Sequence, residues 1–313
     1  MSKLNAHLSL IRWQNLLIMA VILVLLRYGF LVPLNFETVL SPLWHAVLIL
    51  TTVIIAAGGN AVNDAYDVNA DLINKPDRVI ISKILTKDDG LFFGQALLLS
   101  GAILGLVLGY FNQQLTFSYI FPLSALLLWL YAKDLKRRPF IGNLIIAFLG
   151  ALMVFNEAIF DLLSTLKTEE RDIQIQAVYV VMAIAGFSFL LTLIRELIKD
   201  LQDIAGDRKA GYKTLPITSG TLFPKILSIF LLMFATVAVA WIFWQTATAK
   251  DWLSSAYILI FVIAPMLLTL VRIAPATQPE AFKKISLFLK MIMLTGVFSI
   301  LVFTLSFKMN WAG

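Results

Sequence analysis

The stretch that decides the fold is GGNAVNDAYDVNADLINKPDRVI, from Gly58 to Ile80. It follows directly on an apolar run long enough to cross a membrane, and it places Asn63, Asp64, Asp67 and Asp71 at the end of that run. Charged groups are costly next to a hydrocarbon interior, so a cluster of them there indicates a functional site. The cluster is therefore the first candidate site in the chain.

The whole chain has the composition of an integral membrane protein. Of its 313 residues, 60% are hydrophobic and 14% are charged, whereas a soluble domain has about 25% charged residues. Apolar runs near the roughly 20 residues that a spanning helix needs recur along the entire length, which leaves no room for a separate soluble domain. We predict an all-α membrane protein, a single domain over residues 1–313, with nine transmembrane helices. They are Gln14–Val32, Leu43–Val62, Leu91–Phe111, Leu115–Ala132, Ile141–Phe160, Ala177–Ile194, Leu222–Trp244, Leu253–Val271 and Ile285–Ser306.

The net charge of +6 reflects membrane topology rather than nucleic-acid binding. Lys and Arg gather before the first span and after the second, fourth, sixth and eighth spans, whereas the opposite loops have few. By the positive-inside rule these basic loops and the N-terminus are cytoplasmic, at the cell (inner) membrane. The chain has no cysteine and two histidines, which excludes thiol chemistry and disfavours a histidine-rich metal site.

A second acidic cluster, after the sixth span, repeats the spacing of the first. Each cluster places three aspartates at positions i, i+3 and i+7, which on a helix fall within about 60° of one another. One such run alone would be explained as a solvated loop, but two matching runs on the same predicted side indicate a shared site. The first aspartate row is Asp64, Asp67 and Asp71, and the second aspartate row is Asp200, Asp203 and Asp207.

Six clustered carboxylates repel one another and need cations among them. Mg²⁺ fits because it prefers oxygen ligands and is commonly shared between carboxylates and substrate phosphates. Two Mg²⁺ ions and a diphosphate would still leave excess negative charge, so nearby basic side chains would contact the phosphate. We predict that all six aspartates are catalytic residues and metal ligands. The neighbouring substrate-binding residues are predicted to be Asn60 and Asn63 as oxygen donors or orienting groups, and Lys75, Arg78, Lys199 and Arg208 as phosphate partners.

A diphosphate held at the membrane surface beside long apolar helices implies a polyprenyl diphosphate, whose tail lies between the spans among membrane lipids. Mg²⁺ and the basic side chains stabilise the diphosphate as a leaving group. The allylic C–O bond can then ionise, and an acceptor nucleophile captures the carbocation. The sequence therefore predicts a prenyltransferase.

These motifs resemble the UbiA superfamily of intramembrane prenyltransferases over essentially the full chain. The resemblance rests on N-D-x-x-D-x-x-x-D from Asn63, on D-x-x-D-x-x-x-D from Asp200, and on NKPDR from Asn74, where Val79 replaces a frequent second proline. It implies nine helices around a central cavity open sideways to lipid, with a cytoplasmic cap formed by the loops after the second and sixth spans. It also implies that both rows bind the prenyl diphosphate through Mg²⁺.

The loop YAKDLKRRPFIGN, which begins at Tyr131, resembles the basic loop after the fourth span of these enzymes, where a lysine or arginine assists the phosphate. The resemblance adds Tyr131, Lys136 and Arg137 to the predicted substrate-binding residues. Basic residues at this position also serve as topology signals, so that alternative stays open for the loop.

The acceptor is suggested by the pattern RE-x-x-KD-x-x-D-x-x-GD, which begins at Arg195 and adds that residue to the substrate-binding set. It most resembles the digeranylgeranylglyceryl phosphate synthase branch, which transfers a geranylgeranyl group to the hydroxyl of geranylgeranylglyceryl phosphate and forms an ether. Aromatic prenyltransferases of quinone pathways share part of the pattern and stay an alternative. An ion-coupled membrane carrier is a second alternative because acidic groups often mark ion pathways, although carriers place their sites near the midplane.

Other features within the spans have structural explanations. Gly101, Gly105 and Gly109 form a G-x-x-x-G-x-x-x-G ridge, which predicts close helix packing. Arg27 and His45 lie near the predicted outer surface, where their side chains could reach water. We assign these five residues no role in the reaction.

Overall fold

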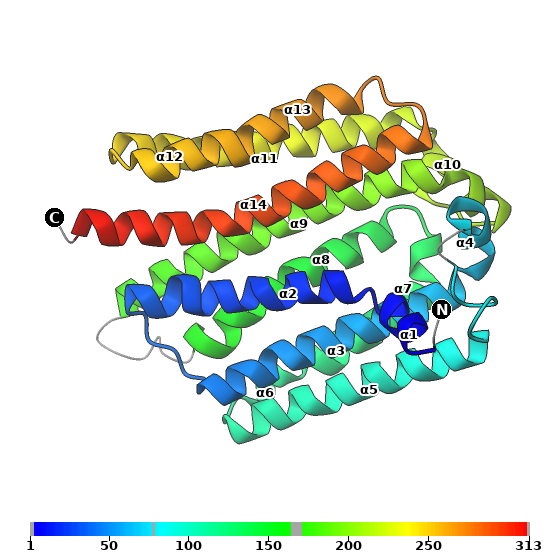
Figure 1. Cartoon of the computed structure of the whole chain (residues 1–313), viewed down its shortest axis with the longest axis horizontal. Coiled ribbons are helices and arrows are strands. Elements are labelled where there is room, and N and C mark those ends of the chain that lie inside the picture. The colour runs from blue at the N-terminus through cyan, green and yellow to red at the C-terminus, as the bar shows by residue number, and fades with distance from the viewer. Residues whose placement is uncertain (1–2, 77–78, 164–170, 312–313) are drawn as a thin grey trace.

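The computed structural model of the chain describes residues 3–76, 79–163 and 171–311. Figure 1 shows a bundle of long helices, and nine spans within the described residues are long and apolar enough to cross a membrane. The nine predicted spans are confirmed, and most extend beyond their apolar runs. The observed spans are Trp13–Leu34, Pro42–Tyr66, Lys87–Phe111, Leu115–Lys133, Ile141–Leu162, Arg171–Lys209, Leu222–Thr248, Trp252–Ile273 and Pro279–Met309.

Several spans consist of more than one helical element, since short π or 3₁₀ turns interrupt them. The first, fifth and eighth spans each contain a π-helical segment. The elements in chain order are α1 (Lys3–Leu10), α2 (Trp13–Leu26), η1 (Arg27–Leu31), η2 (Val32–Leu34), α3 (Pro42–Tyr66), α4 (Val68–Asn74), α5 (Lys87–Phe111), α6 (Leu115–Ser118), α7 (Ile120–Lys133), η4 (Leu135–Arg137), α8 (Ile141–Glu157), η5 (Ala158–Leu162), α9 (Arg171–Lys209), α10 (Leu215–Ser219), α11 (Leu222–Thr248), α12 (Trp252–Ile258), η7 (Leu259–Ile263), α13 (Ala264–Ile273) and α14 (Pro279–Trp311).

Capping residues fix where two neighbouring spans begin. α3 starts after Ser41, whose hydroxyl accepts a hydrogen bond from the backbone N–H of Trp44. α5 starts with a capping box in which the side chains of Thr86 and Asp89 each accept the other residue's backbone N–H. These bonds satisfy donors that the start of a helix leaves unpaired. They thereby set the positions of α3, which carries the start of the first aspartate row, and of α5, which packs against it.

Glycines allow the spans of the first half to approach closely. A side-chain carbon on Gly101 would lie 2.5 Å from the side chain of Ile55 on α3, and one on Gly105 would lie 2.3 Å from the ring of Phe121 on α7. Both distances are shorter than carbon atoms can tolerate. The predicted packing role of this glycine ridge is therefore confirmed.

The longest helix, α9, lies in the interior of the bundle. Its first half packs Ala177 and Val181 against the cluster formed with α2 and α8, and its second half packs Leu191 and Ile198 against α11 and α14. Its 39 residues correspond to roughly 58 Å, which exceeds the roughly 30 Å of a hydrocarbon core. The span predicted to end at Ile194 is part of a helix that continues to Lys209. This continuation carries the second aspartate row.

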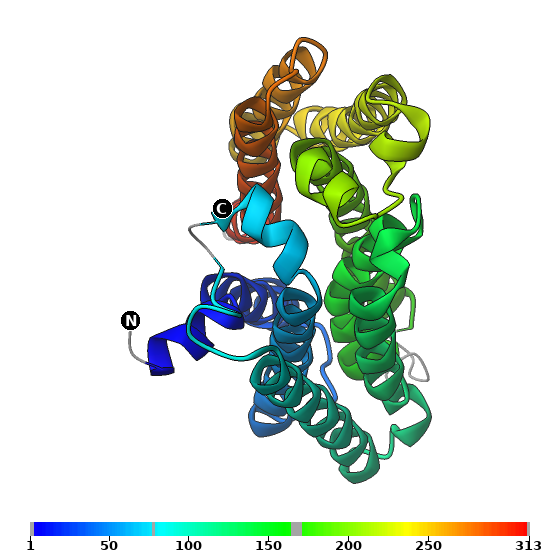
Figure 2. The same ribbon diagram turned by 90° about the vertical axis from the view of Figure 1, so that its right-hand side faces the viewer.

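α4 lies across one end of the bundle, next to the end of α9. Figure 2 shows this end, with the cyan helix α4 running over the ends of the long helices. α4 and α9 are in direct contact. This end of the bundle collects the residues that the sequence singles out.

Candidate active site

The two aspartate rows meet where α4 packs against α9. Asp64 lies in α3, Asp71 lies in α4, and Asp67 forms the junction between these helices with φ −94° and ψ 3°. The prediction that the first row occupies one continuous helical face is therefore wrong, because α3 ends at Tyr66 and the chain turns at Asp67. The second row does lie on a continuous helix, α9.

Asn74 joins α4 to α9. Its side-chain nitrogen donates to the carbonyl oxygen of Asp203 at 3.0 Å, and its side-chain oxygen accepts from the backbone N–H of Gly206 at 2.8 Å. A side-chain carbon on Gly206 would lie 2.4 Å from Asn74 Nδ2 and 2.5 Å from the carbonyl oxygen of Ala70. Glycine is thus required for this close approach, which holds the two rows side by side.

Three of the six aspartates form ion pairs with basic side chains from different parts of the chain. The partners come from the turn before α2, from the end of α4 and from the loop after α7. The pair of Lys75 with Asp203 joins the end of α4 to α9 and so links the two elements that carry the rows. The pairs are Arg12 with Asp64 at 2.5 Å, Lys75 with Asp203 at 2.6 Å, and Lys136 with Asp67 at 2.6 Å.

Asp67 lies at the centre of these contacts. Its Oδ1 accepts a hydrogen bond from the Tyr212 hydroxyl at 3.0 Å, and its Oδ2 accepts one from the Asn63 amide at 2.9 Å. Lys136 also donates to Asn63 Oδ1 at 3.1 Å. Burial lowers the pKa of Lys136 and the Asp67 carboxylate opposes that effect, while burial and Asp67 together raise the pKa of Tyr212. The turn between α3 and α4 is thereby tied to the segment after α9.

The other three aspartates, Asp71, Asp200 and Asp207, form no ion pair with a Lys or Arg among the residues that the structure describes. Asp200 accepts a hydrogen bond from the Asn143 amide at 2.9 Å. Asp207 is buried and close enough to Asp67 and Asp71 to be repelled by both. Burial and the charge of Asp67 raise the pKa of Asp71 to about 6. Negative charge is therefore concentrated between the rows, where it attracts a cation.

The carboxylate oxygens between the rows fit a metal ion that prefers oxygen ligands, such as Mg²⁺. Carboxylates from both rows face this region, and Asp203 Oδ1 is buried with no hydrogen-bond partner within the described part of the chain. On the side of the first row, Asp64 and Asp71 also line a cavity of about 20 Å³ together with Val68, Val79, Ile80 and Ile81, which is room for one ion or water molecule.

Several other predicted residues lie at the same end of the bundle. Asn60 donates to the carbonyl oxygen of Ile11 at 3.0 Å, which ties α3 to the turn before α2. Tyr131 lies within electrostatic range of both Asp67 and Asp200. The Arg137 guanidinium lies over the ring of Tyr212 at 5.1 Å from its centroid. These contacts place side chains of α3, α7 and η4 around the rows.

The remaining predicted substrate-binding residues differ in what they contact. Arg195 and Lys199 both contact the Glu196 carboxylate, at 3.4 Å and 2.9 Å. Arg208 is exposed at the end of α9 and forms no ion pair with either row within the described residues. Arg78 lies outside the described residues.

The predicted site residues did not include four residues that contact the rows: Arg12, Asn143, Tyr212 and Asn74, the last of which begins the NKPDR motif. Asn143 ends the motif that begins at Tyr131, and its place there is a signal that could have identified it. Arg12 stands among the basic residues that set topology, 52 positions from its partner Asp64. No local pattern connects residues at that separation.

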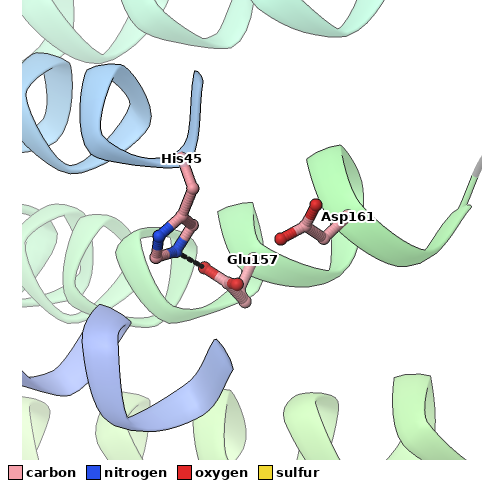
Figure 3. Close-up of side chains that lie close together, drawn as sticks. All are labelled: His45, Glu157 and Asp161. Carbon is pink, nitrogen blue, oxygen red and sulfur yellow. Dashed lines mark hydrogen bonds and ion pairs between the residues drawn. The ribbon is translucent and has the colours of Figure 1, made fainter. Parts of the chain in front are cut away.

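A second buried polar cluster lies at the other end of α3. His45 and Asp64 are separated by 19 positions of this helix, which corresponds to roughly 28 Å. His45 Nε2 lies 3.1 Å from Glu157 Oε2, and Asp161 lies close to both (Figure 3). Arg27 forms an ion pair with Asp161. This cluster is therefore separate from the aspartate rows.

The prediction that Arg27 and His45 reach water is wrong. Their exposed fractions are 3% and 1%, and each contacts a buried carboxylate, Asp161 for Arg27 and Glu157 for His45. Burial of a charge is tolerated when an opposite charge and hydrogen bonds accompany it. Arg27 has both, since it pairs with Asp161 and donates to the carbonyl oxygen of Leu40 and to Thr38 Oγ1, while Asp161 also accepts from the backbone N–H of Leu40 at 2.8 Å.

Known proteins resemble this chain over nearly its full length. Residues 16–294 match the UbiA prenyltransferase family. The digeranylgeranylglyceryl phosphate synthase of Methanosphaera stadtmanae is 32% identical over 300 residues, which cover 95% of this chain and 98% of that protein. A solved structure of a digeranylgeranylglyceryl phosphate synthase aligns with a TM-score of 0.60 and 28% identity, covering 96% of this chain and 99% of its own. A UbiA homologue from Archaeoglobus fulgidus, solved with DMAPP and Mg²⁺, has the same fold, with a TM-score of 0.54, 17% identity, and coverage of 94% and 98%.

Proposed function

The chain belongs to the UbiA prenyltransferase family, and we propose that it transfers a geranylgeranyl group from its diphosphate to the hydroxyl of geranylgeranylglyceryl phosphate. The observation that carries this proposal is the contact of α4 with α9, which brings two rows of carboxylates to one place. The choice of acceptor is supported by the 32% identity to a digeranylgeranylglyceryl phosphate synthase across almost the whole of both chains. The product is an ether lipid.

We propose that the two aspartate rows hold Mg²⁺, as two ions. The UbiA homologue from Archaeoglobus fulgidus binds Mg²⁺ together with a prenyl diphosphate, and Asp71, Asp200 and Asp207 form no ion pair with a Lys or Arg among the described residues. Bound Mg²⁺ would stabilise negative charge on the leaving diphosphate.

Basic side chains would balance the remaining negative charge of the donor site, which is the region between the rows where the prenyl diphosphate would bind. Arg12, Lys75 and Lys136 each pair with an aspartate in this structure. When the aspartates bind cations, these three side chains are free to contact phosphate oxygens, with which they form strong charge-assisted hydrogen bonds. The same residues therefore stabilise the protein without substrate and bind the donor.

The bond changes follow from this arrangement. The allylic C–O bond of the donor breaks, and the diphosphate leaves with the electron pair. The hydroxyl oxygen of the acceptor forms a new bond to the same carbon, and its proton passes to the released diphosphate or to an aspartate. The prenyl tail would lie between the spans of this integral membrane protein, and the basic loops favour a cytoplasmic position for the rows and the N-terminus.

The acceptor is tested by incubating the purified protein with Mg²⁺, geranylgeranyl diphosphate and a panel of acceptors. The panel comprises geranylgeranylglyceryl phosphate, dihydroxynaphthoate, hydroxybenzoate and homogentisate. We expect the mass of the ether product. Prenyl transfer to an aromatic acceptor alone would indicate an aromatic prenyltransferase of the quinone-pathway branch. Ion-coupled uptake into proteoliposomes without prenyl transfer would indicate a carrier.

The role of the rows is tested by Asp67→Ala and Asp203→Ala. We expect both variants to lose turnover while they remain folded in the membrane, because each removes one carboxylate from the metal site. Asp134→Ala is the matched control, since Asp134 is exposed and pairs with Arg138 outside the rows. Full activity of both row variants would refute the proposed site.

A further inference from the structure

Two basic side chains near the rows are short of negative charge. Lys290 on α14 is half-buried, and it donates to a neutral group, Oδ1 of Asn15 on α2, at 2.7 Å. Arg195 on α9 lies close enough to Lys290 to repel it. The Nε of Arg195 is buried and has no hydrogen-bond partner within the described part of the chain. Its contact with Glu196 is long, at 3.4 Å, and the Glu196 carboxylate is shared with Lys199 at 2.9 Å.

This arrangement costs free energy unless an anion joins it. Two like charges held together at a partly buried position repel each other more strongly than in water. A buried guanidinium N–H without an acceptor loses the hydrogen bond that it would make to water. An anion between Arg195 and Lys290 would remove both costs at once.

The cation pair Arg195 and Lys290 is distinct from the donor site but adjacent to it. Arg195 precedes Asp200 by five positions on α9, which corresponds to roughly 7–8 Å along the helix. Asn15 follows Arg12 by three positions, and Arg12 pairs with Asp64 of the first row. A second anionic group could therefore bind here while a diphosphate occupies the rows.

We propose that Arg195, Lys290 and Asn15 bind the phosphate of the acceptor, a phosphomonoester at the glycerol end of a prenyl lipid. The inference rests on the proposed function, which requires an acceptor with such a group. The Arg195 fork suits two phosphate oxygens, and Lys290 supplies a point charge. The Asn15 amide nitrogen can donate to a further oxygen. An acceptor without phosphate would leave in place the repulsion between Arg195 and Lys290 and the missing hydrogen bond of Arg195 Nε within the described part of the chain, so the site selects phosphorylated acceptors.

The test measures the preference for a phosphorylated acceptor. Initial rates are taken with geranylgeranylglyceryl phosphate and with geranylgeranylglycerol at saturating donor and Mg²⁺. We expect Lys290→Met to lower kcat/KM for the phosphorylated acceptor at least about tenfold, since it removes a hydrogen bond between charged groups. The rate with geranylgeranylglycerol and the KM for the donor are expected to stay unchanged, and Lys290→Arg is expected to retain most of the preference.

A binding measurement complements the rates. A prenylglyceryl phosphate whose free hydroxyl is replaced by hydrogen cannot react, and it competes with the acceptor. Its inhibition constant is expected to rise at least about tenfold in Lys290→Met and in Arg195→Gln. An unchanged donor KM would show that the variants are folded. Lys284→Met is the matched control, because Lys284 is exposed on the same helix and its loss removes the same charge.

Two results would overturn the inference. In one, Lys290→Met and Arg195→Gln keep the wild-type preference and the wild-type inhibition constant. In the other, these variants raise the KM for geranylgeranyl diphosphate instead, which would assign the cation pair to the donor. Failure of the proposed function looks different, since the wild-type protein would then transfer nothing to geranylgeranylglyceryl phosphate.

Discussion

Gly206→Ala is expected to disturb the relative position of the two aspartate rows without changing any carboxylate. The added carbon would lie 2.4 Å from Asn74 Nδ2 and 2.5 Å from the carbonyl oxygen of Ala70. Overpacking of this kind costs about 1–3 kcal/mol, and displacing Asn74 also breaks two hydrogen bonds worth about 0.5–1.5 kcal/mol each. Because this cost falls on the contact between α4 and α9, the overpacking alone predicts that donor binding weakens roughly tenfold to a hundredfold, and the lost hydrogen bonds weaken it further.

The assay measures initial rates over a range of geranylgeranyl diphosphate and Mg²⁺ concentrations at saturating acceptor. Gly186→Ala is the matched control on the same helix, since a side-chain carbon on Gly186 would meet nothing within 4 Å. We expect a higher donor KM and a higher Mg²⁺ requirement for Gly206→Ala only. If both alanine variants bind donor and Mg²⁺ as the wild type does, the α4–α9 contact does not set the geometry of the site.

Three further predictions concern stability and metal dependence. Arg27→Met leaves Asp161 buried without its cation, and we expect a loss of about 3–5 kcal/mol, seen as a lower unfolding temperature in detergent; a temperature equal to wild type would contradict the role of this pair. Chelation with EDTA is expected to abolish prenyl transfer and added Mg²⁺ to restore it, whereas full activity in EDTA would exclude a metal-dependent reaction. Gly105→Ala places a carbon 2.3 Å from the Phe121 ring and is expected to destabilise the protein by about 1–3 kcal/mol, with unchanged KM values for the folded fraction.

The spans and the second aspartate row could be predicted because each depends on one helix at a time. An apolar run of about 20 residues has few alternatives to a membrane span, and the i, i+3, i+7 spacing defines one face of α9 as it stands. The same spacing rule was applied to the first row, but the prediction of one helical face is wrong because the helix breaks at Asp67. No Gly or Pro occurs between Asn63 and Asp71, so the sequence carries no breaker signal for that turn.

Contacts between distant segments could not be predicted in the same way. Arg12 and Asp64 are 52 positions apart, and Arg27 and Asp161 are 134 positions apart. Periodicity along a helix describes which residues share a face but not which helix that face meets. From the sequence alone, a lone arginine such as Arg27 is expected to reach water, because its buried partner is visible only in the structure.

Whether both aspartate rows hold one diphosphate through shared divalent ions is best measured in a crystal structure with Mn²⁺ and a non-reactive geranylgeranyl thiodiphosphate. Anomalous scattering locates the ions. We expect them between α4 and α9, each within about 2.5 Å of carboxylate oxygens, with ligands drawn from both rows and the diphosphate bridging them. Ions bound by one row alone, or found only at His45, Glu157 and Asp161 at the other end of α3, would contradict this arrangement.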